Sequence, residues 1–395
     1  MRKPIWMILG LVMTCVSAQD RYTRVSIPQA EAMVLIPEGV QQVRAVIVHA
    51  ANMPLRPSER WTEIARNLHM AHMVIQIDMS GHNRPRRLRE SVVPILNLAS
   101  ERLGHLELAL VPIAATGHSA GGMGLNAFLP LEDRFLTAAI DCSWVIDYER
   151  NPRAEQIPLL FTLGAIPDNF QMLDAIETHF NPARARGAPA TLGLEWGKAH
   201  NFGNAGTLFA AWFHSMAELR LTREPGIMRA IDPQSGWLGD RSSWDTAYAW
   251  IFPYAQYPAN PAEAVWLPDR GFAYVWRAYQ SKDAPAQLTV THPARQSALG
   301  AFQFRSAHEF RTPAEGPLRF GITGVPEPGV KSVRFYHRDQ LLGQVEQPPW
   351  VLETELPVGV YTVFAEVTLT NETRFVTNPA LLILHPPQVR TEEVQ

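Results

Sequence analysis

Apolar and polar positions along the first half of the chain alternate in a way that predicts strands followed by helices. Short apolar runs with the length of buried strands cover residues 43–49, 73–78, the run leading to Gly117, 135–142, 158–164 and 191–196. Helical spacing falls between and after them, at 61–69, 96–103, 120–128, 174–180 and 205–221. This order predicts an α/β fold, a mostly parallel sheet with helices on both faces.

The pattern changes twice after residue 222. Residues 223–285 are crowded with Trp, Tyr and Pro, and we expect a long segment that wraps the sheet domain, with one helix near 272–279. Its aromatic side chains either pack in the core or form a binding platform beside the cleft. From residue 286 to 390, short alternating runs separated by Pro, Gly and Asn turns predict an all-β sandwich; they cover 287–291, 318–322, 332–336, 340–345, 350–354 and 360–370.

Length and charge narrow the picture. A chain of 395 residues indicates about two domains. We place the first at 25–285, including the wrapping segment, and the second at 286–390. The net charge is −3 and no long basic run occurs, so we expect no nucleic-acid or anionic-membrane partner.

The first 18 residues have the pattern of a signal peptide. Arg2 and Lys3 precede a short apolar run, and small residues end at Ala18, where a signal peptidase would cut. The run is too short to span a bilayer, so we expect a secreted or periplasmic protein with no membrane span. A lipoprotein modified at Cys15 is the less favoured alternative, since the residues before it make a poor lipobox. The mature chain then keeps only Cys142, which lies in an apolar context typical of a buried thiol.

One stretch carries the chemistry, the sequence Gly117-His-Ser119-Ala-Gly121 at the end of an apolar run. A nucleophilic serine on a sharp strand-to-helix turn needs glycine two residues before and after it, because side chains there would clash. The helix that follows points its amide dipoles toward the attacked carbonyl. We therefore predict Ser119 as a nucleophile and the Ala120 amide as one oxyanion donor.

A nucleophilic serine needs a histidine base and an acid that orients it, and on such an elbow they follow in the order Ser, acid, His. The strand at 158–164 is followed by Asp168, and the strand at 191–196 by His200. Both lie just past a strand end. Asp141 and Asp147 remain alternatives for the acid. The other histidines precede the serine, lie in helices, or belong to the terminal region.

The residues quoted so far resemble the α/β-hydrolase superfamily over residues 25–285. The 117–123 elbow is similar to that of secreted polyhydroxybutyrate depolymerases and of feruloyl and acetylxylan esterases. The turns at 164–168 and 197–202 are similar to the acid and base turns of cutinases and polyester hydrolases. The resemblance implies ester hydrolysis through an acyl-serine intermediate without a metal or other cofactor. It also places the second oxyanion amide at Ala51, in His49-Ala50-Ala51, where Ala50 replaces the usual glycine.

The last hundred residues resemble the immunoglobulin-like modules appended to secreted bacterial enzymes. We therefore expect an α/β-hydrolase domain followed by a small immunoglobulin-like β-sandwich, which would contact a polysaccharide or another surface. No His-Glu-x-x-His or Cys-x-x-Cys motif occurs, so we expect no catalytic metal.

These observations favour a secreted serine esterase acting on a small-molecule or polymeric ester, such as acyl esters of carbohydrates or polyesters. Trp196, just before the histidine turn, either walls the substrate pocket or packs in the core. Two other functions remain open: a serine peptidase of the same fold, and a non-catalytic binding protein on this scaffold.

Overall fold

The computed structural model describes residues 22–51, 55–56, 58–76, 84–143, 146–166, 170–292, 309–325 and 329–386. The predicted signal peptide with Cys15, and the predicted acid Asp168, lie outside the described residues. Among the helices that are described, none is long and apolar enough to cross a membrane.

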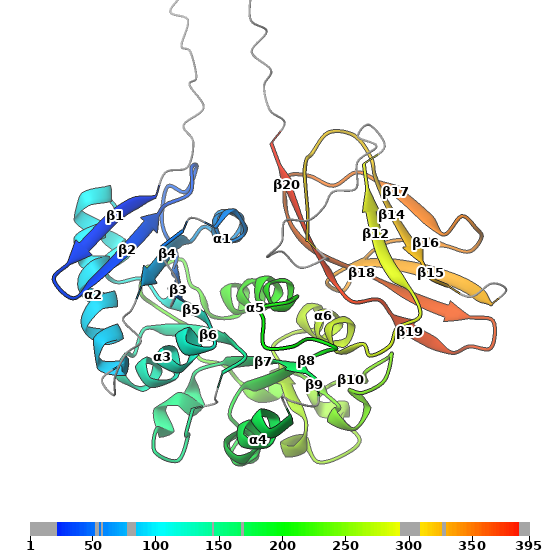
Figure 1. Cartoon of the computed structure of the whole chain (residues 1–395), viewed down its shortest axis with the longest axis horizontal. Helices are drawn as coiled ribbons and strands as arrows, with labels where there is room; N and C mark the ends of the chain where they lie inside the picture. The colour runs from blue at the N-terminus through cyan, green and yellow to red at the C-terminus, as the bar shows by residue number, and fades with distance from the viewer. Residues whose placement is uncertain are drawn as a thin grey trace, which may run out of the picture.

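The centre of the molecule is an eight-stranded sheet in the order β1-β2-β4-β3-β5-β6-β7-β8 (Figure 1). Its strands are β1 Thr23–Ile27, β2 Ala30–Leu35, β3 Val46–Ala51, β4 Ala71–Gln76, β5 Ile113–His118, β6 Phe135–Asp141, β7 Leu159–Ala165 and β8 Ala190–Trp196. The pairs β1–β2 and β2–β4 are antiparallel, and all pairs from β4 to β8 are parallel. The carboxyl ends of β3 to β8 therefore meet at one edge, where sites of such sheets lie.

Helices cover both faces of this sheet, as the sequence predicts. They are α1 Glu59–Asn67, α2 Arg84–Leu103, α3 Ala120–Phe128, α4 Phe170–Ala185, α5 Ala205–Arg220 and α6 Arg270–Gln280. α1, α5 and α6 lie on the side that faces the C-terminal sheets, and α2, α3 and α4 lie on the other side (Figure 1). α2 begins twelve residues before the helix expected at 96–103. It continues through Pro94, although proline inside a helix usually ends or kinks it.

The aromatic segment holds more structure than the one predicted helix. Besides α6 it forms a small antiparallel sheet in the order β10-β9-β11, from β9 Trp237–Gly239, β10 Ile251–Pro253 and β11 Val265–Leu267. Trp266 and Trp276 are fully buried, whereas Trp250 is 55% exposed. Most of the wrapping is therefore packing, with one tryptophan left at the surface.

The C-terminal region forms two further sheets. One has the order β12-β14-β17, from β12 Gln287–Thr291, β14 Leu318–Thr323 and β17 Val351–Thr354. The other has the order β13-β20-β18-β15-β16, with β19 beside β18; its strands are β13 Glu309–Pro313, β15 Val330–His337, β16 Gln340–Val345, β18 Gly359–Leu369, β19 Arg374–Val376 and β20 Ala380–His385. Apolar side chains of both sheets, such as Phe320 and Phe335, share one core. An all-β region of two packed sheets is thus present.

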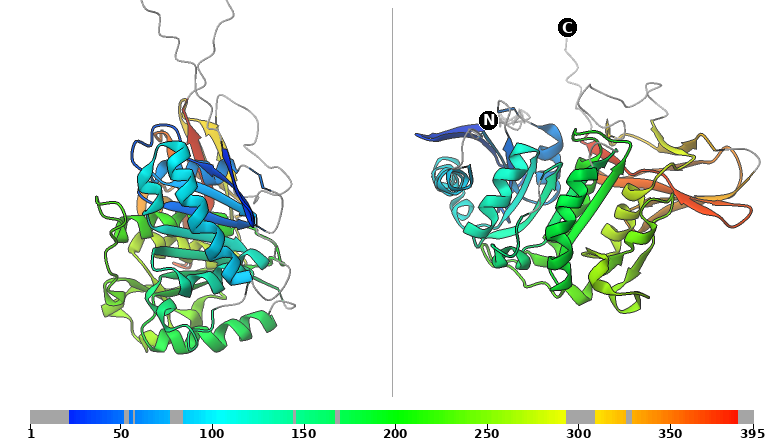
Figure 2. Two further views of the ribbon diagram at one scale, coloured as in Figure 1. Left: turned by 90° about the vertical axis from the view of Figure 1, so that its left-hand side faces the viewer. Right: turned by 60° about the horizontal axis from the view of Figure 1, so that its bottom comes forward.

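The larger of these sheets also packs against the α/β part. Its residues Phe364, Val376, Leu381 and Ile383 belong to the same apolar core as the central sheet and its helices. Figure 2 shows this sheet beginning beside the helical layer and continuing past it. Backbone contacts reinforce the joint, because Val376 N donates to Ala247 O at 3.0 Å.

Candidate functional site

Ser119 lies on the sharp turn between β5 and α3, with φ 51° and ψ −118°. This backbone conformation is unfavourable for a residue with a side chain, and such strain is found where function requires it. The neighbouring glycines make the turn sterically accessible. A Cβ atom on Gly117 would lie 2.7 Å from Gly121 C, and one on Gly121 would lie 2.3 Å from Ala50 O. Both contacts are far too close, which is the physical reason for glycine at these two positions.

His200 comes from the loop after β8 and meets Ser119. Its Nε2 atom lies 3.0 Å from Ser119 Oγ, within hydrogen-bond distance, although 81 residues separate them in the chain. Gly197 starts this loop with φ 73°. The loop then lies directly on β7, because a Cβ on Gly164 would be 2.3 Å from Lys198 O. The sequence order that singled out these two residues thus brings their side chains together.

The third predicted residue, Asp168, lies outside the described residues. β7 ends at Ala165, which pairs with Trp196 at the end of β8. The chain therefore leaves β7 and β8, two adjacent strands, at the same edge of the sheet. Of the two alternatives for the acid, Asp147 contacts Arg150 at 3.2 Å and lies 4.0 Å from His179 Nδ1.

Asp141, the other alternative, ends β6 and has no exposed surface. Its carboxylate accepts hydrogen bonds from His118 Nδ1 at 2.7 Å, Thr162 Oγ1 at 2.7 Å and Lys198 Nζ at 2.9 Å. Its main-chain oxygen accepts from Ser119 N at 2.9 Å. Asp141 therefore joins the serine turn to the histidine loop, and the described contacts direct its carboxylate to His118 and Lys198 rather than to His200.

Lys198 was not singled out by the sequence analysis, yet it is one of the most buried charges near Ser119. Its side chain is 3% exposed and lies 3.6 Å from Glu195 Oε2 as well as 2.9 Å from Asp141. A lysine two residues before a catalytic-type histidine carries no motif. Asp141 ends one strand and Lys198 follows another strand of the same parallel sheet, but no local pattern indicates that these two charges meet.

Electrostatics in this cluster follow from burial and pairing. Burial alone would raise the pKa of Asp141, but the Lys198 ammonium and His118 hold it below its usual value. Asp141 is therefore an ionised acceptor, and His118 Nδ1 must carry the proton of their hydrogen bond. The His200 residue is exposed, and the partial desolvation of its ring, followed by the neighbouring His118, lowers its pKa. His200 is accordingly held in the neutral form that can accept a proton.

The predicted oxyanion donors lie at two element ends that touch. Ala51 is the last residue of β3, and Ala120 is the first residue of α3. The close approach of Gly121 to Ala50 O fixes the start of α3 against the end of β3. Both amides thus belong to backbone next to Ser119, at the carboxyl edge of the sheet.

Trp196 packs toward the aromatic segment. Its indole N–H lies 3.0 Å from both Trp244 O and Gln280 O, which accept from it. Lys282 Nζ lies 4.7 Å from its ring centroid. These contacts are those of a packing residue that fastens the wrapping segment to the end of β8.

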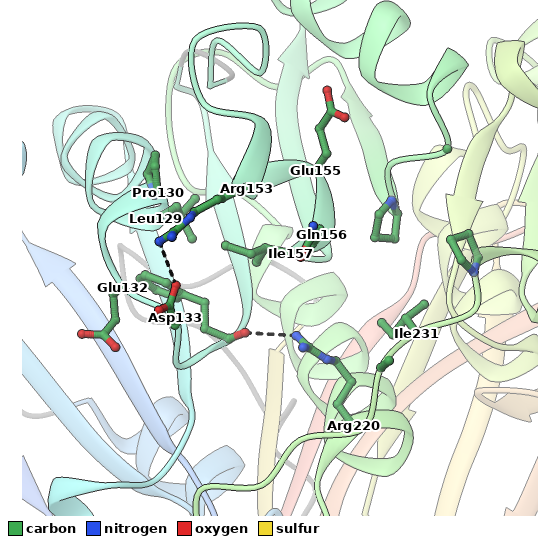
Figure 3. Close-up of a pocket in the computed structure, with 15 residues that line it drawn as sticks. Leu129, Pro130, Glu132, Asp133, Arg153, Glu155, Gln156, Ile157, Arg220 and Ile231 are labelled. Atoms are coloured by element: carbon green, nitrogen blue, oxygen red, sulfur yellow. Dashed lines mark hydrogen bonds and ion pairs between the residues drawn. The ribbon is translucent and has the colours of Figure 1, made fainter.

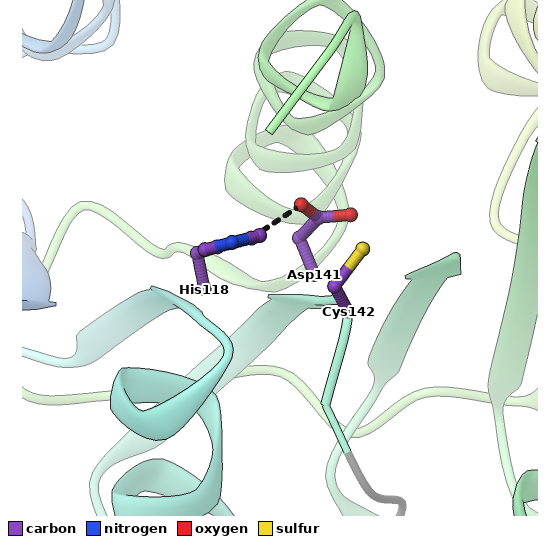
Figure 4. A group of neighbouring side chains, drawn as sticks. All are labelled: His118, Asp141 and Cys142. Carbon is purple, nitrogen blue, oxygen red and sulfur yellow. Dashed lines mark hydrogen bonds and ion pairs between the residues drawn. The ribbon is translucent and has the colours of Figure 1, made fainter. Parts of the chain in front are cut away.

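One set of three side chains with metal-ligating chemistry occurs among the described residues, namely His118, Asp141 and Cys142, whose ligand atoms lie within 4.8 Å of one another (Figure 4). Lys198 already places a positive charge on Asp141. Burial raises the pKa of Cys142 to about 12, so its sulfur is a thiol rather than the thiolate that binds metals. The chemistry of the set therefore suits a hydrogen-bonded network better than a metal ion.

The cavity drawn in Figure 3, of about 640 Å³, is not beside Ser119. It is lined by Phe135, Ile157 and Pro189, which lie at the amino ends of β6, β7 and β8. It therefore opens at the edge of the sheet opposite the Ser119–His200 pair.

Neither a family model nor a curated protein matches the sequence. Among solved structures, the chain is similar to S-formylglutathione hydrolase from Agrobacterium tumefaciens, with 12% identity, a TM-score of 0.37, and coverage of 50% of this chain and 94% of that one. It is also similar to the acylaminoacyl peptidase of Pyrococcus horikoshii, with 15% identity and a TM-score of 0.39. This match covers 51% of this chain and 42% of the peptidase chain. The fibronectin(III)-like modules of Clostridium thermocellum CbhA match at 18% identity and a TM-score of 0.19, over 25% of this chain and 94% of that one.

The assignment of the fold rests on the molecule itself. The central sheet runs β1-β2-β4-β3-β5-β6-β7-β8 with antiparallel β2, and Ser119 stands on the strained turn from β5 into α3. A nucleophile-type serine at the top of such a sheet, followed in the chain by a histidine in contact with it, is the arrangement of this superfamily. The chain therefore has the α/β-hydrolase fold, as the resemblance in its sequence implied.

Proposed function

We propose that this protein is a serine hydrolase that cleaves carboxylic esters through an acyl-serine intermediate. The observation that carries the proposal is the 3.0 Å contact between Ser119 Oγ and His200 Nε2 on a turn with φ 51°. A serine hydroxyl becomes a nucleophile when an adjacent neutral imidazole can take its proton. The lowered pKa of His200, caused by partial desolvation and by His118, supports that role.

In the first half of the reaction, Ser119 Oγ attacks the ester carbonyl carbon while its proton moves to His200 Nε2. The carbonyl oxygen becomes an oxyanion, which the amides of Ala51 and Ala120 stabilise. The carbon–oxygen bond to the alcohol then breaks, and His200 gives its proton to the leaving oxygen. The acyl group remains on Ser119.

In the second half, His200 takes a proton from water, and the resulting hydroxide attacks the acyl carbon. The tetrahedral intermediate collapses, the bond to Ser119 Oγ breaks, and the proton on His200 returns to the serine. Asp168 orients the imidazole and stabilises its charged form in this proposal. Asp141, at the end of β6, stabilises the site because it accepts hydrogen bonds from Ser119 N, His118 Nδ1 and Lys198 Nζ.

The natural substrate belongs outside the cytoplasm in this proposal. Residues 1–18 direct export, and the released protein acts on acyl esters of carbohydrates or on polyesters. Small soluble esters are the natural first probes, because they need only the Ser119–His200 chemistry.

Hydrolysis of p-nitrophenyl acetate by the mature protein tests the proposal. We expect activity in the parent and a fall in kcat of about a thousandfold or more in both Ser119→Ala and His200→Ala. His179→Ala is the matched control, because this histidine is part-exposed and lies near Asp147 instead of Ser119.

If the parent does not hydrolyse the ester but cleaves a peptide amide, the protein is a peptidase of the same fold instead of an esterase. A parent inactive on both classes would favour the binding-protein alternative. Full activity in Ser119→Ala would show that the nucleophile is another residue.

A further inference from the structure

A second recess lies where the aromatic segment meets the larger C-terminal sheet. It has a volume of about 460 Å³ and is lined from β10 and α6 on one side and from β15, β18 and β19 on the other. None of its residues takes part in the reaction proposed above. We call it the arginine–aromatic groove and define it by Tyr248, Trp250, Tyr274, Arg277, Arg334 and Arg374.

Aromatic faces make up much of the groove. Trp250 is 55% exposed, although it is a large apolar side chain. Its backbone is fixed, since Trp250 N donates to Ser243 Oγ at 2.8 Å and Trp250 O accepts from Asp240 N at 2.9 Å. An exposed indole on a fixed stretch of backbone offers a flat surface for the face of a ring.

The guanidinium groups are held in place by these rings. The centre of the Arg277 guanidinium lies 4.4 Å from the Tyr248 ring and 5.3 Å from the Tyr274 ring. Its Nε donates to Ala249 O at 3.0 Å and its Nη1 to Tyr248 OH at 2.8 Å. The centre of the Arg374 guanidinium also lies 4.7 Å from the centroid of the Tyr248 ring. Such stacking prepares arginines to bind an anion without further ordering.

Charge in the groove is unbalanced. Its lining holds three arginines, Arg277, Arg334 and Arg374, but a single carboxylate, that of Glu366. Glu366 is 7% exposed and lies 3.8 Å from Arg277 and 4.0 Å from Arg334. It also accepts from Tyr248 OH at 2.9 Å. One buried carboxylate offsets one guanidinium, so the groove keeps an excess of positive charge that an anionic group would neutralise.

The groove continues into a second hollow of about 750 Å³ that shares Arg334 and Arg374. This extension is lined by hydrogen-bonding groups of both kinds, including Ser332, Gln344 and Thr368, and by both signs of charge, as in the Lys331–Glu372 pair. A mixed lining suits hydroxyl groups, which donate and accept, rather than a dense row of phosphates.

We propose that the arginine–aromatic groove binds an acidic oligosaccharide. A sugar ring would lie on the exposed face of Trp250, its carboxylate or sulfate would pair with Arg374 and Arg334, and neighbouring hydroxyls would occupy the extension. Arginine binds such planar or branched anions through paired hydrogen bonds. The chain's net charge of −3 adds no general attraction for polyanions, so recognition is local to the groove.

The groove is linked to the catalytic edge by a short length of chain. Trp196, at the end of β8, donates to Trp244 O, and Tyr248 follows four residues later. Four residues span at most about 14 Å. A ligand held here would therefore keep a polymer near the molecule that carries Ser119, while its binding does not depend on the ester chemistry.

Calorimetric titration of the whole protein tests the proposal with hexamers of matched length. We expect binding of oligogalacturonate, chondroitin sulfate or both, and none of neutral maltohexaose. Binding of oligogalacturonate, with or without binding of chondroitin sulfate, indicates that a carboxylate suffices, whereas binding of chondroitin sulfate alone indicates a sulfate. Either result supports the groove, provided that Arg374→Gln and Trp250→Ala each weaken it by about tenfold or more.

Matched controls are Arg319→Gln and Ile227→Ala, because Arg319 is 51% and Ile227 54% exposed outside the groove. They should bind as the parent does, and all four variants should hydrolyse p-nitrophenyl acetate like the parent. Three results overturn the proposal: binding to neither acidic hexamer, binding unchanged in both groove variants, or equal or tighter binding of hexathymidylate. If the parent binds an acidic hexamer but does not hydrolyse the ester, the result contradicts the proposed function and leaves the groove proposal standing.

Discussion

The backbone of Ser119 is held in its strained form by contacts on both sides. Ser119 N donates to Asp141 O at 2.9 Å, and Ser119 O accepts from Met123 N at 3.0 Å. These bonds over-determine a φ of 51°, which a free chain would avoid. The hydroxyl therefore stays aimed at His200 before any substrate arrives, which is the preorganisation that catalysis needs.

Replacing Gly121 by alanine tests this turn. The new Cβ would meet Ala50 O at 2.3 Å, and since that atom is backbone, the start of α3 must shift. We expect kcat for ester hydrolysis to fall by about tenfold or more, with a smaller change in KM. Gly359→Ala is the control, because its nearest neighbour is at an ordinary 3.4 Å. Parent-like kinetics in Gly121→Ala would contradict the steric account.

The ionisation of His200 sets the pH dependence at this scale. The imidazole must be neutral to accept the serine proton, so activity rises as the pH rises through its pKa. Partial desolvation and His118 lower that pKa, so we expect the acid limb of kcat/KM to lie at lower pH than for an unperturbed histidine. Lys198 contributes in the same direction. His118→Gln removes the larger of these two charge contributions and should move the limb to higher pH. An unmoved limb would show that His118 does not act on His200.

At the scale of elements, a buried ion pair joins the loop after β8 to the end of β6. Lys198 and Asp141 lie 2.9 Å apart with 3% and 0% of their side chains exposed. Such a pair is costly to break, because the remaining charge stays buried without its partner. The pair thus holds the His200 loop in a fixed position relative to the Ser119 turn.

Lys198→Met leaves the Asp141 charge uncompensated. We expect the free energy of unfolding, measured by denaturant titration, to fall by about 3–5 kcal/mol. The control is Lys331→Met, which breaks an exposed pair with Glu372 and should cost at most about 1 kcal/mol. Equal effects of the two substitutions would mean that the buried pair adds no special stability.

Which elements the sequence predicts, and which it does not, has physical reasons. Strongly apolar strands such as β6 and β7 are recognised because burial on both faces leaves an unbroken apolar run. The sequence does not predict β1, because this strand is short and half exposed. It does not predict β13 either, because that strand begins with a buried charged residue, Glu309. Glu309 is compatible with burial only because two arginines pair with it: Arg60, which is far away in the chain, and Arg311, which is two residues away.

The site shows the same division. Ser119 and His200 could be predicted because a glycine elbow and the order of strands restrict where they stand. The Asp141–Lys198 pair could not, because no local pattern says which charges meet at the end of a parallel sheet. The role of Asp168 stays a prediction, since the residue lies outside the described part of the chain.

At the scale of the whole molecule, the C-terminal sheets and the α/β part share a core. Ser281 Oγ donates to Val376 O at 2.6 Å, and Asn204 Nδ2 donates to Pro379 O at 2.6 Å. Asn204 stands at the start of α5, four residues after His200. The C-terminal strands thus support the end of the histidine loop as well as the helical layer.

This shared core predicts cooperative unfolding. Because Phe364 and Ile383 are buried against the helices, separation of the two parts would expose apolar surface that both parts need. We expect a single transition in differential scanning calorimetry, with Phe364→Ala lowering its midpoint without splitting it. Two resolved transitions in the parent would show that the parts unfold independently.

The most direct test of the central claim is mass spectrometry of the protein after reaction with a fluorophosphonate, which forms a covalent bond with an activated serine. We expect one adduct, located on the peptide that holds Ser119, absent in Ser119→Ala and formed much more slowly in His200→Ala. An adduct on another serine, or no adduct on the folded parent, would contradict the assignment of Ser119 as the nucleophile.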